Sequence, residues 1–460
     1  MNQNDTICAI VTGIGVAGVS IIKISGDDAI QIAEKIWRSK KNINEMPSHT
    51  FCFGRVFDPE KNKFIDEGLL LLMKAPSSYT GEDVVELQVH GSWIGVTYIT
   101  ELLIKYGARY AEPGEFTKRA FLNGKLDLIK AEGIIDLIES NSRQQLSFAS
   151  SSIGGKNSDV IYNIIDDLIE LIAYMEASID FPEDDVPALS KDYKIDKLQF
   201  IFNTLNIILD KSNKGKYLTQ GINLLIIGEP NVGKSSLLNM LLNEDRAIVS
   251  DIPGTTRDTI EESLVIGKLP VKIVDSAGIR NSDDIIEKLG IDKTKNFIDK
   301  ADFIVYMLDA SLPYKKQDDL IYDLIKEKEK IILLNKVDLI DSDCIQPQIK
   351  ETFNNERILY FSTNNSKYLI EFEKILEDIF LDSSYDYHEG AFITNSRQKG
   401  LLEQSLFFIS QALHSSIDDM QDDFITIDLY DAKKSLEEMV GIQVSSDILD
   451  QIFSKFCIGK

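Results

Sequence analysis

One short segment near the middle of the chain constrains the fold more than any other, the octapeptide Gly228–Ser235 (GEPNVGKS). It fits the GxxxxGK[ST] pattern between an apolar run and a helical pattern, the strand–turn–helix context of a phosphate-binding loop (P-loop). Backbone N–H groups of such a loop and of the helix N-terminus bind phosphate oxygens. We therefore expect Lys234 at the β- and γ-phosphates and the Ser235 hydroxyl on Mg²⁺. The neighbouring candidates are Asn231, Val232, Gly233 and Ser236.

Two later motifs predict that the base is guanine. Residues 335–338 (NKVD) fit NKxD at the end of a predicted strand. A carboxylate at Asp338 accepts both the N1–H and the exocyclic amine of guanine, a pair of donors that adenine lacks, and Asn335 is expected on the N7 side. Residues 362–364 (STN) follow the next strand and are expected to offer a backbone amide to guanine O6, although the usual sequence is Ser-Ala-Lys. The base-side candidates are Asn335, Lys336, Asp338, Ser362, Thr363 and Asn364.

The segments expected to face the γ-phosphate lie between these motifs. Residues 275–278 (DSAG) fit DxxG, so Asp275 is expected to hold a water on Mg²⁺ and the Gly278 amide to sense the γ-phosphate. Residues 250–258 (SDIPGTTRD) are the expected first switch, in which Thr256 reaches Mg²⁺ when a γ-phosphate orders the loop. The other candidates here are Ser250, Thr255, Ser276 and Ala277.

The residue that orients the attacking water is not the usual one. Ras-like GTPases place a Gln directly after DxxG, but this chain has Ile279, which cannot orient a water. Another group must do so. The nearby carboxylates are Asp283, Asp284 and Glu287, and the residues alone leave the choice among them open, with a solvated surface acid as the simpler interpretation of each.

The order of apolar patterns predicts the architecture, an α/β domain followed by a helical domain that is interrupted by a second α/β domain. Runs at 20–25, 69–73 and 84–89 indicate strands of the first domain, and from about residue 119 the pattern is helical, with an apolar stripe over 161–175. Short runs from 218 to about 380 predict a parallel sheet wrapped by helices. These runs are 223–227, 272–275, 303–308, 331–335 and 358–361, and helical stripes return at 402–413 and 449–456.

The charge balance and the cysteines exclude several classes of protein. Lys and Arg total 49 against 74 Asp and Glu, a net charge of -25, which argues against a freestanding nucleic-acid binder but not against a basic partner. The four cysteines are scattered and form no CxxC pair, so neither a disulfide framework nor a structural zinc site is expected. The first residues contain no export signal, and no apolar stretch reaches the length of a membrane span. We expect a cytoplasmic protein.

Three further segments resemble the signatures of one family, the tRNA modification GTPases called MnmE or TrmE. They are 78–83 (SYTGED), 113–125 (PGEFTKRAFLNGK) and the terminal pentapeptide 456–460 (FCIGK), and the resemblance runs over essentially the whole chain. It implies an N-terminal tetrahydrofolate-binding and dimerisation domain at 1–118. It also implies a helical domain in two halves, 119–217 and 381–460, with a Ras-like GTPase domain at 218–380 inserted between them.

The resemblance also implies an activity and its partners. Members of this family work with an FAD-dependent partner, MnmG (GidA). Together they add an aminomethyl or carboxymethylaminomethyl group to carbon 5 of the wobble uridine of certain tRNAs, and GTP hydrolysis drives a conformational cycle. The resemblance further implies a homodimer, with tRNA bound mainly by the partner.

Functional positions of the family fall on particular residues of this chain. The folate positions are Lys23, Glu86, Lys125 and Lys460. The Mg²⁺ ligands match Ser235 and Thr256, and the potassium ligands match Asn231, Ser250, Ile252 and Thr255. The catalytic glutamate matches Glu287, and Cys457 matches a cysteine suspected of a catalytic role.

The chain departs from the family pattern at three places, all in the predicted folate domain. Residues 12–17 (TGIGVA) stand where Thr-Pro-x-Gly-[Lys/Arg]-Gly is usual, and residues 90–92 (HGS) replace His-Gly-Gly. Lys23 replaces a common arginine and loses the planar guanidinium that suits bidentate contacts.

Two alternative functions remain open from the sequence. One is a regulatory GTPase switch, such as a ribosome-assembly factor, which transfers no carbon unit. The other is a folate-binding scaffold with a degenerate nucleotide site, which the intact GTPase motifs disfavour. A plain switch needs neither the N-terminal domain nor the terminal CIGK sequence, so these two features discriminate it from the family function.

Overall fold

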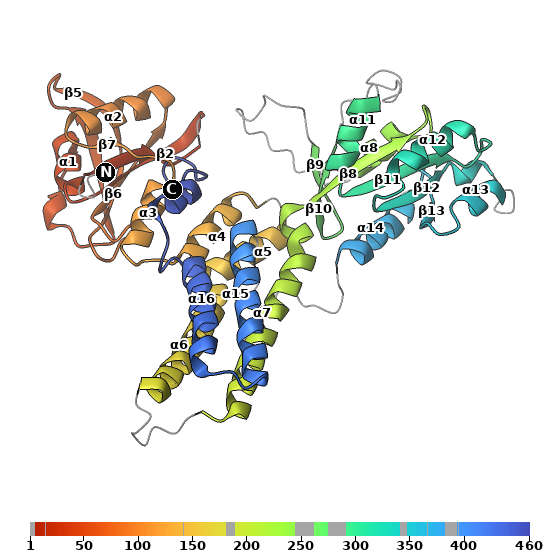
Figure 1. The fold of residues 1–460 in the computed structure, drawn as a ribbon. Helices are drawn as coiled ribbons and strands as arrows, with labels where there is room; N and C mark the ends of the chain where they lie inside the picture. Colours follow the sequence, from red (N-terminus) through yellow and green to blue (C-terminus); the bar gives the residue numbers. More distant parts are fainter. Residues whose placement is uncertain are drawn as a thin grey trace. The chain divides into compact units, whose positions relative to one another are not determined.

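The computed structural model describes residues 5–13, 15–140, 142–180, 189–243, 262–274, 291–340, 347–365, 367–381, 393 and 395–460 (Figure 1). The chain divides into two compact units. The first contains residues 1–139, 149–203 and 400–460, and the second contains residues 140–148 and 204–399.

The N-terminal part of the first unit is a mixed sheet with helices on one face. The strand order is β3-β4-β5-β6-β2-β1-β7, and neighbouring strands are antiparallel except β1 and β7, which are parallel. Helices α1 (Ala29–Ile36) and α2 (Trp93–Lys105) pack their apolar faces on this sheet. The strands are β1 Ile7–Ile10, β2 Ala17–Ser25, β3 Trp37–Ser39, β4 Thr50–Asp58, β5 Lys63–Met73, β6 Val84–Gly91 and β7 Arg109–Tyr110.

The three strands that the sequence predicts in this part lie within β2, β5 and β6. Alternate side chains of these strands point into the core. In β2, Ile22 and Ile24 are fully buried and pack with Leu70 of β5 and Leu87 of β6 beneath the helices. The opposite face of the sheet is less covered. Strands β1, β3, β4 and β7 were not predicted.

The helical part of the first unit confirms the predicted apolar stripe. Six residues of α6 (Lys156–Asp180) that repeat at spacings of three and four are all buried. They are Ile161, Ile164, Ile165, Leu168, Ile172 and Met175. Helix α6 packs along α16 (Figure 1). The predicted end of this helix at 181–185 lies outside the described residues.

The other helices of the helical segments follow the predicted order. Helix α4 begins where the Asp127 carboxylate accepts a 2.9 Å hydrogen bond from the Lys130 amide, a side-chain N-cap. The helices are α3 Glu115–Leu122, α4 Leu128–Ile138, α5 Arg143–Ile153, α7 Lys191–Gln220, α15 Ser396–Ile417, α16 Asp422–Val440 and α17 Ser446–Phe453.

The second unit contains the predicted sheet, with one difference. The strand order is β13-β12-β11-β8-β10-β9, and all pairs are parallel except β9 with β10. Strand β9 is an antiparallel edge strand that was not predicted, and the turn at Gly267 and Lys268 joins it to β10. The strands are β8 Ile222–Gly228, β9 Glu262–Ile266, β10 Leu269–Ile273, β11 Phe303–Asp309, β12 Lys330–Asn335 and β13 Ile358–Tyr360.

Helices cover both faces of this sheet, so its central strands are apolar on both sides. In β8, Leu224 and Ile226 belong to one core, whereas Leu225 and Ile227 belong to another on the opposite face. This explains why the central strands are continuous apolar runs in the sequence. The helices are α8 Lys234–Asn243, α11 Ile291–Lys300, α12 Lys316–Ile325, α13 Pro347–Thr352 and α14 Lys367–Phe380, and a short 3-10 helix, η2, spans Val337–Leu339.

Candidate functional site

The octapeptide forms a loop between β8 and α8 in the second unit. The backbone turns through left-handed conformations at Asn231 (φ 63°) and Gly233 (φ 108°), and α8 begins at Lys234. The Lys234 ammonium donates 2.7 Å hydrogen bonds to the carbonyl oxygens of Gly228 and Glu229. The loop therefore curls around the lysine as expected of a P-loop, with Ser235 and Ser236 in the first turn of the helix.

A glycine is required at position 233 because the Asn335 side chain lies very close to it, and because of its backbone angle. A Cβ atom at this position would lie 2.2 Å from Nδ2 of Asn335. No side chain fits there without displacing Asn335. The P-loop and the NKxD motif are thus packed directly against each other.

Asn335 ties the loops of three strands together. Its side chain is fully buried, and Nδ2 donates a 2.7 Å hydrogen bond to the Val232 carbonyl of the P-loop. Its Oδ1 accepts a 3.3 Å hydrogen bond from the amide of Thr363, after β13. Both polar groups of Asn335 are engaged by the protein, so Asn335 positions the P-loop and residues 362–364 in addition to any contact with the base.

Lys336 extends the same connection toward the exposed side of the P-loop. Its Nζ donates a 2.9 Å hydrogen bond to the Asn231 carbonyl and lies 2.6 Å from Oδ2 of Asp309, at the end of β11. Burial of Asp309 opposes its ionisation, but the hydrogen bonds from Lys336 and Ser311 outweigh burial and hold its pKa below the usual value. A buried carboxylate therefore fixes the lysine of the NKxD motif.

Asp338 is exposed at the same edge of the sheet and is held ready to accept hydrogen bonds. Oδ2 of Asp338 accepts a 3.1 Å hydrogen bond from Nδ2 of Asn364. Hydrogen bonds from Ser362 and Asn364 lower the pKa of Asp338, so its carboxylate is ionised at neutral pH. Because β8, β12 and β13 end at this edge, the candidates at 231–236, 335–338 and 362–364 meet where ligands bind in open parallel sheets.

The candidates on the γ-phosphate side have no structural placement. Ser250, Ile252, Thr255, Thr256, Asp275, Ser276, Ala277, Gly278 and Glu287 lie outside the described residues, as do Asp283 and Asp284.

A second candidate site lies in the first unit around Lys23. Lys23 of β2 stands directly opposite Glu86 of β6, with Nζ 3.6 Å from Oε1. The ammonium also lies 5.5 Å from the centre of the Tyr79 ring and 5.4 Å from that of Phe116. Burial lowers the pKa of Lys23; Glu86 opposes this effect and the charge of Lys460 adds to it.

The end of the chain reaches this site by docking beside the start of α3. The Phe116 amide donates a 3.1 Å hydrogen bond to the Lys460 carbonyl, and Pro113 forms a β-bridge with Ile458. Gly459 (φ 95°) passes so close to β1 that a Cβ atom would lie 2.8 Å from Cγ1 of Val11. The positions predicted for folate at Lys23, Glu86 and Lys460 are therefore brought together.

Lys125, which follows the end of α3, is connected to the Lys23 site only indirectly. Its Nζ donates a 2.9 Å hydrogen bond to the Pro76 carbonyl, close to the loop that carries Tyr79. Cys457 is an exposed free thiol in the docked terminal segment.

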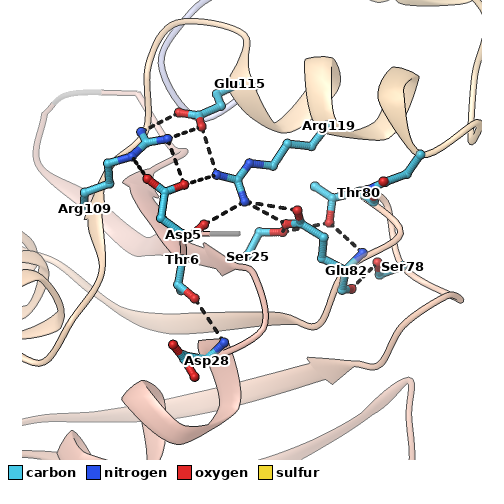
Figure 2. Close-up of polar contacts among 11 residues, drawn as sticks. Asp5, Thr6, Ser25, Asp28, Ser78, Thr80, Glu82, Arg109, Glu115 and Arg119 are labelled. Atoms are coloured by element: carbon cyan, nitrogen blue, oxygen red, sulfur yellow. Dashed lines mark hydrogen bonds and ion pairs between the residues drawn. The ribbon is translucent and has the colours of Figure 1, made fainter. Parts of the chain in front are cut away.

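Sequence reasoning missed Tyr79 and Phe116, the two aromatic rings around Lys23. Both occur in the signature segments 78–83 and 113–125, so the motifs contained the signal. It also missed that Arg119 of these segments forms ion pairs with Glu82 and Glu115 (Figure 2). Among the described residues, no group of His, Cys, Asp or Glu has the arrangement of a metal site, and no described helix is long and apolar enough to cross a membrane.

Comparison with known proteins gives matches over nearly the whole chain. Residues 6–125 match the family model described as the GTP-binding protein TrmE N-terminus, and residues 128–457 match the MnmE helical domain. A protein of Acetivibrio thermocellus named tRNA modification GTPase MnmE is 42% identical over 460 residues. Proteins of the same name from Alkaliphilus oremlandii and Geobacillus thermodenitrificans are 40% and 38% identical. Each alignment covers 100% of both chains.

Proposed function

Because the chain belongs to the tRNA modification GTPase MnmE family, we propose that it hydrolyses GTP in the course of modifying tRNA. With an FAD-dependent partner of the MnmG family, it adds an aminomethyl or carboxymethylaminomethyl group to carbon 5 of the wobble uridine of certain tRNAs. The full-length identity to the named relatives carries this proposal. The packing of the P-loop against the NKxD motif supports the GTPase part.

GTP is the nucleotide that the site fits. The ionised Asp338 carboxylate at the edge of the sheet matches the two donors of guanine. Asn335 holds the P-loop beside it, so the base and the phosphates are bound by one connected set of residues. Lys234 neutralises the β- and γ-phosphates.

Hydrolysis requires cations, and the oxygen donors of this chain suit them. Ser235 lies in the first turn of α8, and together with Thr256 it would ligate Mg²⁺ through hard hydroxyl oxygens. Asn231 is exposed in the P-loop, and it would hold potassium with Ser250, Thr255 and the Ile252 carbonyl. Such a cation supplies charge that an arginine finger supplies in other GTPases. Glu287 orients the attacking water.

The residues around Lys23 form the proposed folate site. The ammonium groups of Lys23 and Lys460 suit the glutamyl carboxylate of a tetrahydrofolate, and Glu86 can accept pterin N–H groups. The partly exposed Tyr79 ring offers a flat apolar surface beside the lysine, and the fully buried Phe116 ring packs next to it. Lys125 borders the same loop through Pro76.

The first unit also offers a surface for a homodimer. The outward face of β4 and β5 carries Phe51, Phe53 and Leu69, which are 65%, 61% and 36% exposed. Phe51 pairs with Leu71 across the strands and Phe53 with Leu69, so the apolar residues are contiguous. Burying them against a second copy removes apolar surface from water.

The proposal includes the domain boundaries expected from the sequence, after residues 118, 217 and 380. It also includes a cytoplasmic location. The acidic chain leaves most tRNA contacts to the partner, since phosphate contacts need basic surface. A regulatory GTPase switch is the alternative, and the docked terminal segment beside Lys23 favours the modification enzyme.

Calorimetry with the purified protein tests the nucleotide assignment. The wild type is expected to bind GTP far more tightly than ATP, because a site built to pair with a donor rejects analogues that lack it. Asp338→Asn is expected to shift the preference toward xanthosine triphosphate, while Asp323→Asn on α12 serves as the control. Equal wild-type affinity for ATP and GTP would contradict the assignment.

A further inference from the structure

A network of ion pairs joins α3 to the loop that carries Tyr79, one of the rings beside Lys23. Figure 2 shows the Arg119 guanidinium between Asp5, Glu115 and Glu82, each within hydrogen-bonding distance. Its Nη2 lies 3.0 Å from oxygens of Asp5 and Glu115, and its Nη1 lies 3.0 Å from Oε1 of Glu82. Arg109 binds the same Asp5 and Glu115 carboxylates from the other side.

Arg119, Glu115 and Glu82 are largely removed from water, whereas Asp5 and Arg109 are 36% and 34% exposed. The side chains of Arg119 and Glu115 are each only 9% exposed, and that of Glu82 is 16% exposed. The hydrogen bond from Arg109 is the largest influence that lowers the pKa of Asp5. Burial would raise the pKa of Glu115, but hydrogen bonds from both arginines outweigh it. Several partners meet at each charge, which gives the network one preferred geometry.

Glu82 connects the ion-pair network to the loop of residues 78–82. Its carboxylate accepts a 2.7 Å hydrogen bond from the Ser25 hydroxyl, which in turn lies 2.7 Å from the Thr80 hydroxyl. Its carbonyl accepts a hydrogen bond from Ser78. The loop is therefore held at both ends of the segment that contains Tyr79.

Helix α3 fastens the same loop at two more points. Oγ1 of Thr117 lies 2.9 Å from the Tyr79 hydroxyl, and Nδ2 of Asn123 donates a 2.6 Å hydrogen bond to the Thr80 carbonyl. Phe116 of this helix supplies the second ring at Lys23, and its amide binds the terminal residue. Arg119 thus links the helix that holds the chain end to the loop that holds Tyr79.

We propose that Arg119 is a positioning residue of the candidate site at Lys23: through Glu82 it helps to fix the 78–82 loop, so that the Tyr79 ring stays beside Lys23. The proposal rests on the proposed folate function of that site. Arg119 itself touches no ligand. A planar guanidinium is needed because it donates to three carboxylates in fixed directions, which an ammonium cannot do.

The chain contains its own matched control in Arg109. Both arginines bind Asp5 and Glu115, but only Arg119 also binds Glu82. Removing either guanidinium breaks ion pairs in the same network and lowers stability. Only the removal of Arg119 also takes away the ion pair that links the loop, through Glu82, to the network.

The experiment compares Arg119→Ala, Arg109→Ala and the wild type in the full-length protein. Affinity for 5-formyltetrahydrofolate is measured by calorimetry, GTP affinity serves as the internal control, and amide hydrogen exchange reports on residues 78–83. Arg119→Ala is expected to lose about two- to twelvefold in folate affinity, the scale of the cost of immobilising one freed side chain on binding. Exchange in the loop should become faster, and GTP affinity should stay unchanged. Arg109→Ala is expected to bind folate nearly as the wild type does. If Arg119→Ala fails to fold, Glu82→Gln weakens the same link from the loop side and is assayed in the same way.

Equal effects of the two arginine substitutions on folate affinity and on loop exchange would overturn the proposal, because the network would then act on stability alone. Unchanged loop exchange in Arg119→Ala would overturn it as well. If the wild type bound no folate, the proposed ligand would be wrong, and loop exchange would still decide whether Arg119 positions residues 78–82.

Discussion

Nδ2 of Asn335 donates a 2.7 Å hydrogen bond to the carbonyl oxygen of Val232, so the motif proposed to read the base also holds the loop proposed to bind the phosphates. The contact is fully buried on the Asn335 side. The adjacent Gly233 leaves room for it, since a Cβ atom there would collide with the same nitrogen. One side-chain amide therefore connects the proposed base site to the proposed phosphate site.

Asn335→Ala should consequently weaken GTP binding even if the base kept its contact with Asp338. The substitution leaves the buried Val232 carbonyl without this donor, which costs about 1–3 kcal/mol, or roughly five- to 150-fold in affinity if the loss falls on the bound state. Lys315→Ala is the control, because Lys315 also contacts the P-loop, but through an exposed ion pair with Glu229. Calorimetry with GTP gives both values, and equal losses in the two variants would contradict the coupling.

Hydrolysis should depend on potassium and on Glu287. Turnover in potassium should greatly exceed turnover in sodium at equal ionic strength, because the proposed cation site supplies the positive charge that an arginine finger supplies in other GTPases.

Glu287→Ala should lower kcat by about a hundredfold or more, the scale of general acid–base catalysis, with little change in GTP affinity. Asp283→Ala and Asp284→Ala are the matched controls for a nearby carboxylate. Equal rates in the two salts would remove the potassium site, and wild-type turnover in Glu287→Ala would transfer the role to Asp283 or Asp284.

Folate binding should depend on the charge at the chain terminus. Lys460→Gln retains the carbonyl that accepts the Phe116 amide and removes only the ammonium group near Lys23. We expect about a tenfold or larger loss of folate affinity, since a hydrogen bond to a charged group contributes about 1.5–3 kcal/mol. GTP affinity should not change. Lys455→Gln is the control in an exposed position of the same terminal region. An unchanged folate affinity in Lys460→Gln would exclude the terminal lysine from the site.

The buried Lys23 predicts a pH dependence of stability. Burial lowers its pKa in the folded protein below the value of 10.5 for a free lysine. Between these two values the unfolded chain binds more protons than the folded chain, so this group makes stability rise with pH. In Lys23→Arg the guanidinium stays charged throughout, and the wild type should gain stability relative to this variant as the pH rises toward 10.5. Denaturant unfolding over a pH series measures the difference, with Lys455→Arg as the control. A constant difference would show that the Lys23 ammonium is not penalised by burial.

The convergence of the P-loop, the NKxD motif and residues 362–364 was predictable because each motif is encoded by local spacing. A P-loop, an NKxD motif and the apolar strand before each occupy only a few consecutive residues, and the ends of parallel strands meet at one edge. The contacts that join them were not predictable. Asp309 and Lys336 pair across neighbouring strands through a register that only the folded sheet defines.

The N-terminal sheet was harder to predict because its apolar residues do not all face the core. In β4, Phe51 and Phe53 point outward while Cys52 and Gly54 are buried, which is the reverse of the usual pattern. Gly54 is buried because the Trp37 ring occupies the space that a side chain would need. A strand with phenylalanine on its outer face gives no clear core signal, and the proposed second copy accounts for that face.

The cluster around Lys23 required both the register of β2 with β6 and the docking of a terminal segment more than four hundred residues away. The resemblance named Lys23, Glu86 and Lys460, but the sequence contained no sign that Phe116 binds the last residue. The sequence showed Arg119 and Glu82 only as members of two signature segments and gave no sign that they contact each other. Their pairing depends on the fold.

The nucleosides of tRNA from the organism that makes this protein provide the most direct test of the central claim, and mass spectrometry measures them. We expect a strain that lacks the gene to lose the aminomethyl-type groups at carbon 5 of the wobble uridine. The wild-type gene should restore them, and a gene with Lys234→Ala should not, because that variant cannot bind the GTP phosphates. Unchanged wobble uridines in the deletion strain would contradict the account.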